Sequence, residues 1–88
     1  MTWWIVTDLV VTDPEDVKLV TLARGARSRI QAQSGAAVRD ETGRTYASAS
    51  ISLDAFAASA LMLAVAQAFA AGARGLEAVV VVGQAPDE

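Results

Sequence analysis

Gly43-Arg-Thr-Tyr-Ala-Ser-Ala-Ser-Ile-Ser52 opens the stretch that decides the fold of this chain. An alanine-rich run follows as far as Gly72, and the stretch ends with Leu76-Glu-Ala-Val-Val-Val-Val-Gly83. From Tyr46 to Ser52, polar residues alternate with small or apolar ones, which is the period of a strand with one buried face. The consecutive valines before Gly83 predict a second strand that is buried on both faces. Because a helical run separates these strands, the sequence predicts a strand–helix–strand crossover.

We expect the helix of this crossover to run from Leu53 to Ala71. Ser52 can accept a hydrogen bond as its N-cap, and Asp54 in the first turn suits the positive end of the helix dipole. Residues 55–71 contain no charged residue, glycine or proline, and alanine is the strongest helix former. Gly72 is expected to end the helix in the left-handed conformation.

The predicted helix carries apolar side chains all round. At about 100° per residue, one side collects the large residues Leu61, Met62, Val65 and Phe69. Phe56 and Leu63 lie nearly opposite, and no charged residue marks a solvent face. A helix of this kind must be covered on all sides. We therefore expect one side to pack on the sheet and the other to pack on a second copy of the protein.

The composition excludes several kinds of site. The 88 residues are enough for one domain. There is no cysteine, which excludes disulfides and thiolate nucleophiles. There is no histidine, which removes the commonest general base and a usual zinc ligand. The net charge of −3 argues against a general nucleic-acid binder.

Most of the basic residues lie in the middle third of the chain. We interpret them as a solvated face of a helix and a hairpin. Asp40 and Glu41, at the tip of that hairpin, are expected to be solvated as well. The basic residues of this group are Arg24, Arg27, Arg29, Arg39 and Arg44.

Residues 1–12 are expected to form an N-terminal arm or an extra strand, and residues 13–88 a single domain. The first segment contains Trp3 and Trp4, whose large apolar area favours burial. It lacks the basic region of a signal peptide, so we expect a cytoplasmic protein. Residues 55–71 are nearly long enough to span a membrane. We favour a buried helix and no membrane contact, because alanine dominates the run and a strand follows it.

A first helix is predicted to begin at Pro14, with Asp13 as its cap. Gly25 weakens the pattern by about 1 kcal/mol and leaves two readings open. Either the helix continues to Gln33, or a strand begins at Ala26. Residues 36–41 then form a short strand, and a turn at residues 42–43 leads back as a hairpin.

The resulting order of arm or strand, helix, strand, strand, helix and strand resembles the cytidine deaminase family over about residues 14–83. The run Val17-Lys-Leu-Val-Thr-Leu-Ala-Arg-Gly-Ala and the segment Ser34-Gly-Ala-Ala-Val-Arg-Asp-Glu-Thr-Gly-Arg-Thr-Tyr46 carry the resemblance, together with Gly72 and the valine strand. The resemblance implies an α/β fold in which a shortened mixed sheet is flanked by helices. The strand at residues 36–41 would lie between the other two, antiparallel to its hairpin partner.

The resemblance also implies where the family's site would lie. In that family an Asn-x-Glu pair holds the ribose, and a Cys-Ala-Glu start of the next helix supplies a zinc ligand and the proton-shuttling glutamate. Ser50 and Ser52 occupy the first pair of positions here, Ser59 the zinc ligand and Leu61 the glutamate. The family's Pro-Cys-x-x-Cys segment has no counterpart in residues 83–88. Leu61 is expected to fill the former metal site as ordinary core.

These departures predict no catalytic residue, no metal and no cofactor. Hydrolytic deamination needs a metal-activated water and a carboxylate that moves protons. We therefore expect a catalytically inactive, self-associating structural or regulatory module, a homodimer or a tetramer. One alternative is an active cytidine deaminase that completes its zinc site from another chain. Another is a small α+β module that binds RNA or a ligand through the Arg24–Arg44 cluster, although we expect no nucleic-acid partner.

Overall fold

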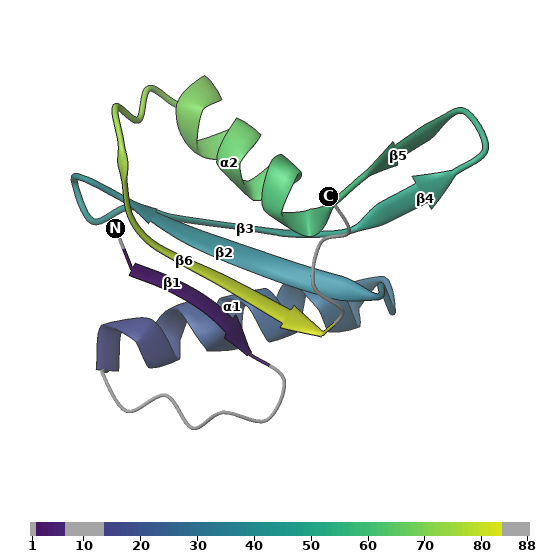
Figure 1. Cartoon of the computed structure of the whole chain (residues 1–88), viewed down its shortest axis with the longest axis horizontal. Helices are drawn as coiled ribbons and strands as arrows, with labels where there is room; N and C mark the ends of the chain where they lie inside the picture. Colours follow the sequence, from purple (N-terminus) through teal and green to yellow (C-terminus); the bar gives the residue numbers. More distant parts are fainter. Residues whose placement is uncertain (1, 7–13, 84–88) are drawn as a thin grey trace.

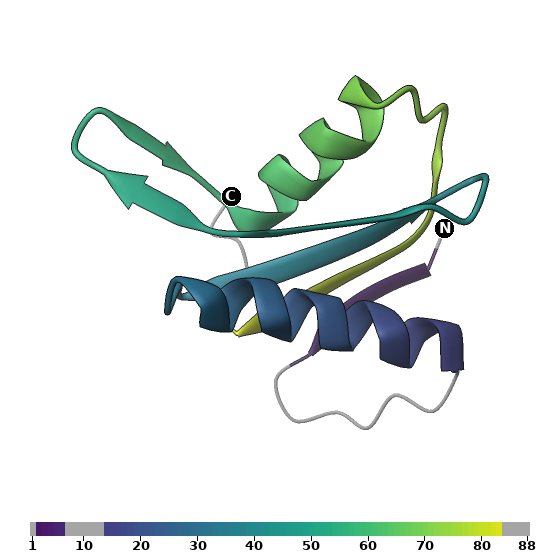
Figure 2. The ribbon, with the colours of Figure 1, turned by 180° about the vertical axis from the view of Figure 1, so that it is seen from behind.

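The computed structural model describes residues 2–6 and 14–83, which form a three-layer α/β structure. Helix α1 covers one face of a four-stranded sheet and helix α2 covers the other, as Figures 1 and 2 show. This arrangement confirms the predicted fold class. The elements in chain order are β1 (Thr2–Val6), α1 (Pro14–Arg29), β2 (Ser34–Asp40), β3 (Thr45–Ala49), β4 (Ile51–Leu53), β5 (Phe56–Ala58), α2 (Ala60–Ala70) and β6 (Leu76–Gly83).

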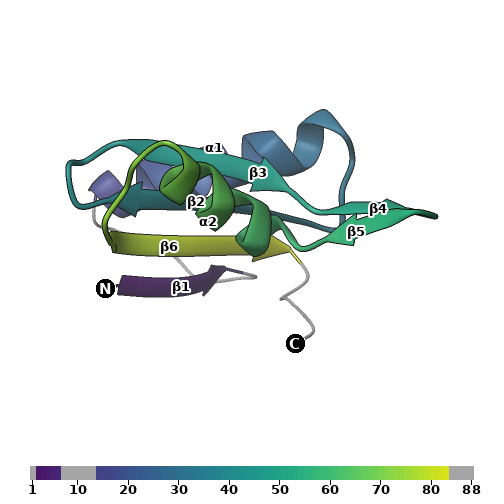
Figure 3. The same ribbon diagram turned by 90° about the horizontal axis from the view of Figure 1, so that it is seen from above.

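The strands of the main sheet follow the order β1-β6-β2-β3 (Figure 3). Strand β2 is antiparallel to both β3 and β6. Strands β3 and β6 therefore run parallel to each other and are joined through α2, which confirms the predicted crossover. The position of β2 between its two neighbours confirms the strand order that the resemblance implied.

The N-terminal segment contributes a strand to the sheet of its own chain. Strand β1 pairs in parallel with β6, with Thr2 opposite Ala78 and Val6 opposite Val82. This resolves the choice between an arm and a strand for residues 2–6. The predicted burial of Trp3 and Trp4 concerns side chains outside the described part of the structure, and so does the predicted cap at Asp13.

The valine strand β6 is the centre of the core. Val80 and Val82 pack beneath α1, together with Leu19 and Ala37. Val79 and Val81 point to the opposite face and pack beneath α2. Because successive side chains of a strand alternate between faces, alternate valines of β6 pack against α1 and against α2. The predicted buried strand is confirmed.

Helix α1 continues through Gly25 and ends at Arg29. Leu19, Ala23 and Ala26 are buried at helical spacing, so the strand proposed to begin at Ala26 is wrong. The extension to Gln33 is also wrong. Residues 30–31 form a turn instead, after which the chain enters β2.

The segment after β3 differs from the predicted helix. Residues 51–58 form the hairpin β4–β5, in which Ile51 pairs with Ala58 and Leu53 with Phe56. Helix α2 therefore begins at Ala60, with Ser59 rather than Ser52 as its N-cap. The backbone N–H of Met62 donates to the Ser59 hydroxyl oxygen at 3.0 Å. The capping bond and the hairpin pairing together override the helix propensity of residues 53–58.

The end of α2 and the β2–β3 turn follow the predictions. Gly72 has a φ of 101° and Gly43 a φ of 90°. Residues that have a Cβ atom rarely adopt this left-handed backbone conformation. Gly72 therefore ends the helix, and Gly43 closes the hairpin turn, as expected.

Candidate functional site

The predicted site positions lie around the start of α2 and the end of β3. Ser59 and Leu61 belong to the first turn of α2. Ser50 follows β3, where its backbone N–H donates to the Ser34 carbonyl at 3.0 Å and its hydroxyl accepts from the Ser34 N–H at 3.3 Å. Ser52 lies elsewhere, exposed on the hairpin strand β4. Ser50 therefore closes the end of the sheet, while Ser52 is carried away from it.

Ser59 and Leu61 have structural roles at the start of α2. The Ser59 hydroxyl accepts the capping hydrogen bond of α2, and the leucine side chain of Leu61 cannot titrate. Leu61 is half-buried and packs against the core beneath α2. Leu61 therefore contributes to the margin of the core, and its place in a former metal site stays a prediction. Within residues 2–6 and 14–83, no cluster of three acidic, cysteine or histidine residues is placed to bind a metal ion.

Helix α2 faces the sheet with its small residues. Ala60, Ala64 and Ala68, spaced four residues apart, are its buried positions. At about 100° per residue, Met62, Ala66 and Phe69 lie on the opposite side, which we call the outer face of α2. Met62 is 57% exposed and Phe69 is 48% exposed. The side that packs on the sheet is therefore the alanine side, because alanine allows the helix to approach the sheet closely.

The outer face belongs to a long uncharged part of the chain. Residues 45–73 contain a single charged residue, Asp54, although the whole chain has 17, the sum of 7 basic and 10 acidic residues. This part also contains four of the large apolar residues that the structure leaves exposed: Leu53, Phe56, Met62 and Phe69. The tip of the hairpin and the outer face of α2 therefore each expose two large apolar side chains.

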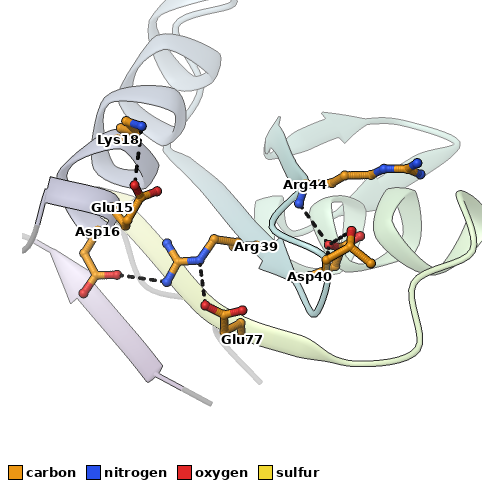
Figure 4. A network of polar contacts seen from close by, with 8 residues as sticks. Glu15, Asp16, Lys18, Arg39, Asp40, Arg44 and Glu77 are labelled. Carbon is orange, nitrogen blue, oxygen red and sulfur yellow. Dashed lines mark hydrogen bonds and ion pairs between the residues drawn. The ribbon is translucent and has the colours of Figure 1, made fainter.

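Arg39 forms an ion-pair cluster at the other side of the molecule (Figure 4). Its Nη2 atom lies 3.5 Å from Asp16 Oδ1, and its Nε atom donates to Glu77 Oε1 at 3.3 Å. The Arg39 side chain is only 13% exposed, so it does not belong to the predicted solvated basic face. The cluster joins α1, β2 and β6.

Asp40 is buried, not solvated as the sequence suggested. It is 2% exposed, and its Oδ1 atom accepts hydrogen bonds from the Thr42 hydroxyl at 2.7 Å, the Thr42 N–H at 2.9 Å and the Arg44 N–H at 3.0 Å. Its Oδ2 atom accepts from the Tyr46 hydroxyl at 3.3 Å. These hydrogen bonds, chiefly that of the Thr42 hydroxyl, lower the pKa of Asp40 below 3.8 and outweigh the effect of burial, which raises it. The carboxylate organises the hairpin turn.

We expect Asp40→Ala to lower the melting temperature at pH 7 and to do so less at about pH 3. The lowered pKa means that the folded state holds this proton less tightly than the unfolded state does. The stabilisation is therefore complete above the unfolded pKa of about 3.9 and is lost as the pH falls through the folded value. Thermal melts at the two pH values measure this. Asp54→Ala, which removes an exposed carboxylate, is the control. A loss for Asp40→Ala that is the same at both pH values would contradict this role.

A signal for Asp40 was present in the sequence. A carboxylate followed two residues later by threonine and then by glycine is typical of a turn in which the aspartate accepts backbone hydrogen bonds. The burial of Arg39 had no such local signal, because its partners Asp16 and Glu77 are distant in the chain.

Neither helix in the described part of the chain is long and apolar enough to cross a membrane. Of residues 55–71, for which a buried helix is expected, residues 60–70 form α2 on the sheet.

Comparison with known proteins identifies the family. No curated protein matches the chain. A family model described as cytidine deaminase-like matches residues 12–88, which is most of the sequence. The predicted resemblance is confirmed, and the chain belongs to the cytidine deaminase-like family.

Proposed function

We propose that this protein is a catalytically inactive member of its family that self-associates as a structural or regulatory module in the cytoplasm. One observation carries the proposal. Helix α2, at whose start the resemblance implies the family's site, packs on the sheet through alanines and exposes Met62 and Phe69. In this protein the helix presents an apolar surface in place of catalytic groups.

The chemistry of the site positions supports inactivity. On the alignment that the resemblance implies, Leu61 replaces the glutamate that moves protons, and Ser59 replaces the zinc ligand. The whole sequence contains neither cysteine nor histidine. A zinc ion bound by ligands from another chain would still lack the proton shuttle, because that position is a leucine. This argues against the alternative of an active deaminase with a shared site.

The exposed side chains support self-association. Burying a Met or Phe side chain completely stabilises a complex by about 1.5–3 kcal/mol, and a partly exposed one gains a share of that. In a two-fold symmetric dimer each residue of the patch is buried twice, once in each copy. The outer face of α2 carries no charged group, so a second copy meets no like charge there. A tetramer would be a dimer of such dimers.

Native mass spectrometry tests both parts of the proposal in one experiment. We expect an assembly of two or four chains at micromolar concentration, without the added mass of a zinc ion on each chain. We also expect no ammonia release above background when the protein is mixed with cytidine. A monomer would contradict the self-association, and stoichiometric zinc or steady ammonia release would contradict the inactivity.

A further inference from the structure

The hairpin β4–β5, residues 51–58, is an unsupported extension of the fold. Its strands of three residues each form a separate two-stranded sheet, and within residues 2–6 and 14–83 they pair only with one another. It projects beyond the end of the main sheet, as Figures 1 and 3 show. Leu53 and Phe56 lie opposite each other at its tip and are 66% and 51% exposed. The tip therefore places two large apolar side chains in water.

A hairpin of this size needs to pack against another surface to be stable. An isolated two-stranded hairpin is marginally stable at best in water, and a hydrophobic face packed against another element is what stabilises it. The hairpin joins α2 at Ser59 and points away from the helix (Figure 2). The outer face of its own α2 is therefore not placed to cover the tip. Among residues 2–6 and 14–83, the strands of the hairpin pair with no other strand, and we take the covering surface to come from another molecule.

We infer that the hairpin is an arm that packs Leu53 and Phe56 against the outer face of α2, at Met62 and Phe69, in a second copy of the protein. This inference rests on the proposed self-association and specifies its geometry. In a two-fold arrangement each arm reaches the partner's helix, so that both arms and both outer faces are covered at once.

The distribution of charge favours this surface for contact between two copies. Sixteen of the 17 charged residues lie outside residues 45–73, the part that contains both the arm and the outer face of α2. The chain has a net charge of −3, so two copies repel each other over most of their surfaces. Like charges brought together at an interface cost several kcal/mol. Contact through the arm and α2 involves only Asp54, at the hairpin turn, and so avoids most of that repulsion.

Cysteine cross-linking tests this geometry directly, because the natural chain has no cysteine. The Phe56→Cys variant is mixed in equal amounts with Met62→Cys, with Phe69→Cys, or with the control Ile30→Cys, and oxidised mildly. Ile30 matches Met62 in exposure, at 57% each, but lies next to α1. We expect mixed disulfides between Phe56→Cys and at least one α2 variant, formed at least tenfold faster than with Ile30→Cys.

A second measurement does not depend on disulfide geometry. Phe56→Ser is expected to weaken the dimer about tenfold or more, as loss of a central aromatic contact does, whereas Ile30→Ser should leave it unchanged. The inference is overturned if the wild type is a dimer but Phe56→Ser dimerises normally and Phe56→Cys reacts no faster with the α2 variants than with Ile30→Cys. That result would leave the proposed self-association standing. A monomeric wild type would overturn both.

Discussion

Replacing Met62 and Phe69 together by glutamate should convert the associated protein into a monomer. The two side chains lie on the outer face of α2, away from the alanines that pack on the sheet. A symmetric dimer would then bury four carboxylates with no cationic partner, and burying an unpaired charge is strongly unfavourable. We expect the dissociation constant of the dimer to rise by about 100-fold or more, measured by sedimentation equilibrium.

The matched control for this experiment is Ile30→Glu. Ile30 has the same 57% exposure as Met62, and the substitution adds the same charge to a surface that we do not place in the interface. It should dimerise as the wild type does. The circular dichroism of the double variant should also remain native, since neither replaced side chain belongs to the core. A double variant that associates as tightly as the wild type would show that the outer face of α2 is not the interface.

Gly35→Val should cause the largest loss of stability of any single substitution considered for this fold. A Cβ atom at Gly35 would overlap the carbonyl oxygen of Ala23 in α1 and would lie 2.9 Å from the Cβ of Arg27. The helix backbone is rigid, so β2 and α1 would have to move apart. Overpacking of this kind costs about 1–3 kcal/mol and occasionally more, out of a total of about 5–15 kcal/mol for a typical domain.

Urea unfolding of the two glycine variants measures this effect. Gly25→Ala is the control, because a Cβ at Gly25 meets no atom within 4 Å. Gly25 lies inside α1, where alanine is preferred over glycine by about 1 kcal/mol. This variant should therefore be as stable as the wild type or more stable. Equal stability of Gly35→Val and the wild type would contradict the close packing of α1 on β2.

Much of the main sheet could be predicted because its signals are local. The valine run of β6 reads as a buried strand, and Gly43 and Gly72 mark the turn and the helix end at which the structure has positive φ. The order of the elements was sufficient to indicate the family, which the match over residues 12–88 confirms. The sequence left open whether the N-terminal segment is an arm or a strand, because β1 pairs with β6, which is distant in the sequence.

The hairpin β4–β5 could not be predicted because residues 53–58 contain no glycine or proline and are rich in alanine. Ser52 and Ser59 are both suitable helix caps in sequence, and only the pairing of Leu53 with Phe56 decides between them. With a helix that begins at Leu53, as predicted, the hairpin arm would not exist.

The side of α2 that faces the sheet could not be predicted for a different reason. Large apolar residues usually mark the buried side of a helix, and Leu61, Met62, Val65 and Phe69 share one side. The structure buries Ala60, Ala64 and Ala68 instead, and Leu61 and Val65 pack at the margin of the core. The expectation that the other side of this helix packs on a second copy stays a prediction. The assignment of Ser50, Ser52, Ser59 and Leu61 to the family's site stays a prediction.

Hydrogen–deuterium exchange measured as a function of protein concentration tests the central claim most directly. If the outer face of α2 joins two copies, amides of residues 60–70 and of the arm should exchange more slowly above the dissociation constant than below it. Amides of α1, on the opposite face of the sheet, should exchange at the same rate at both concentrations. Exchange in α2 that does not depend on concentration, or slowing confined to α1, would contradict self-association through α2.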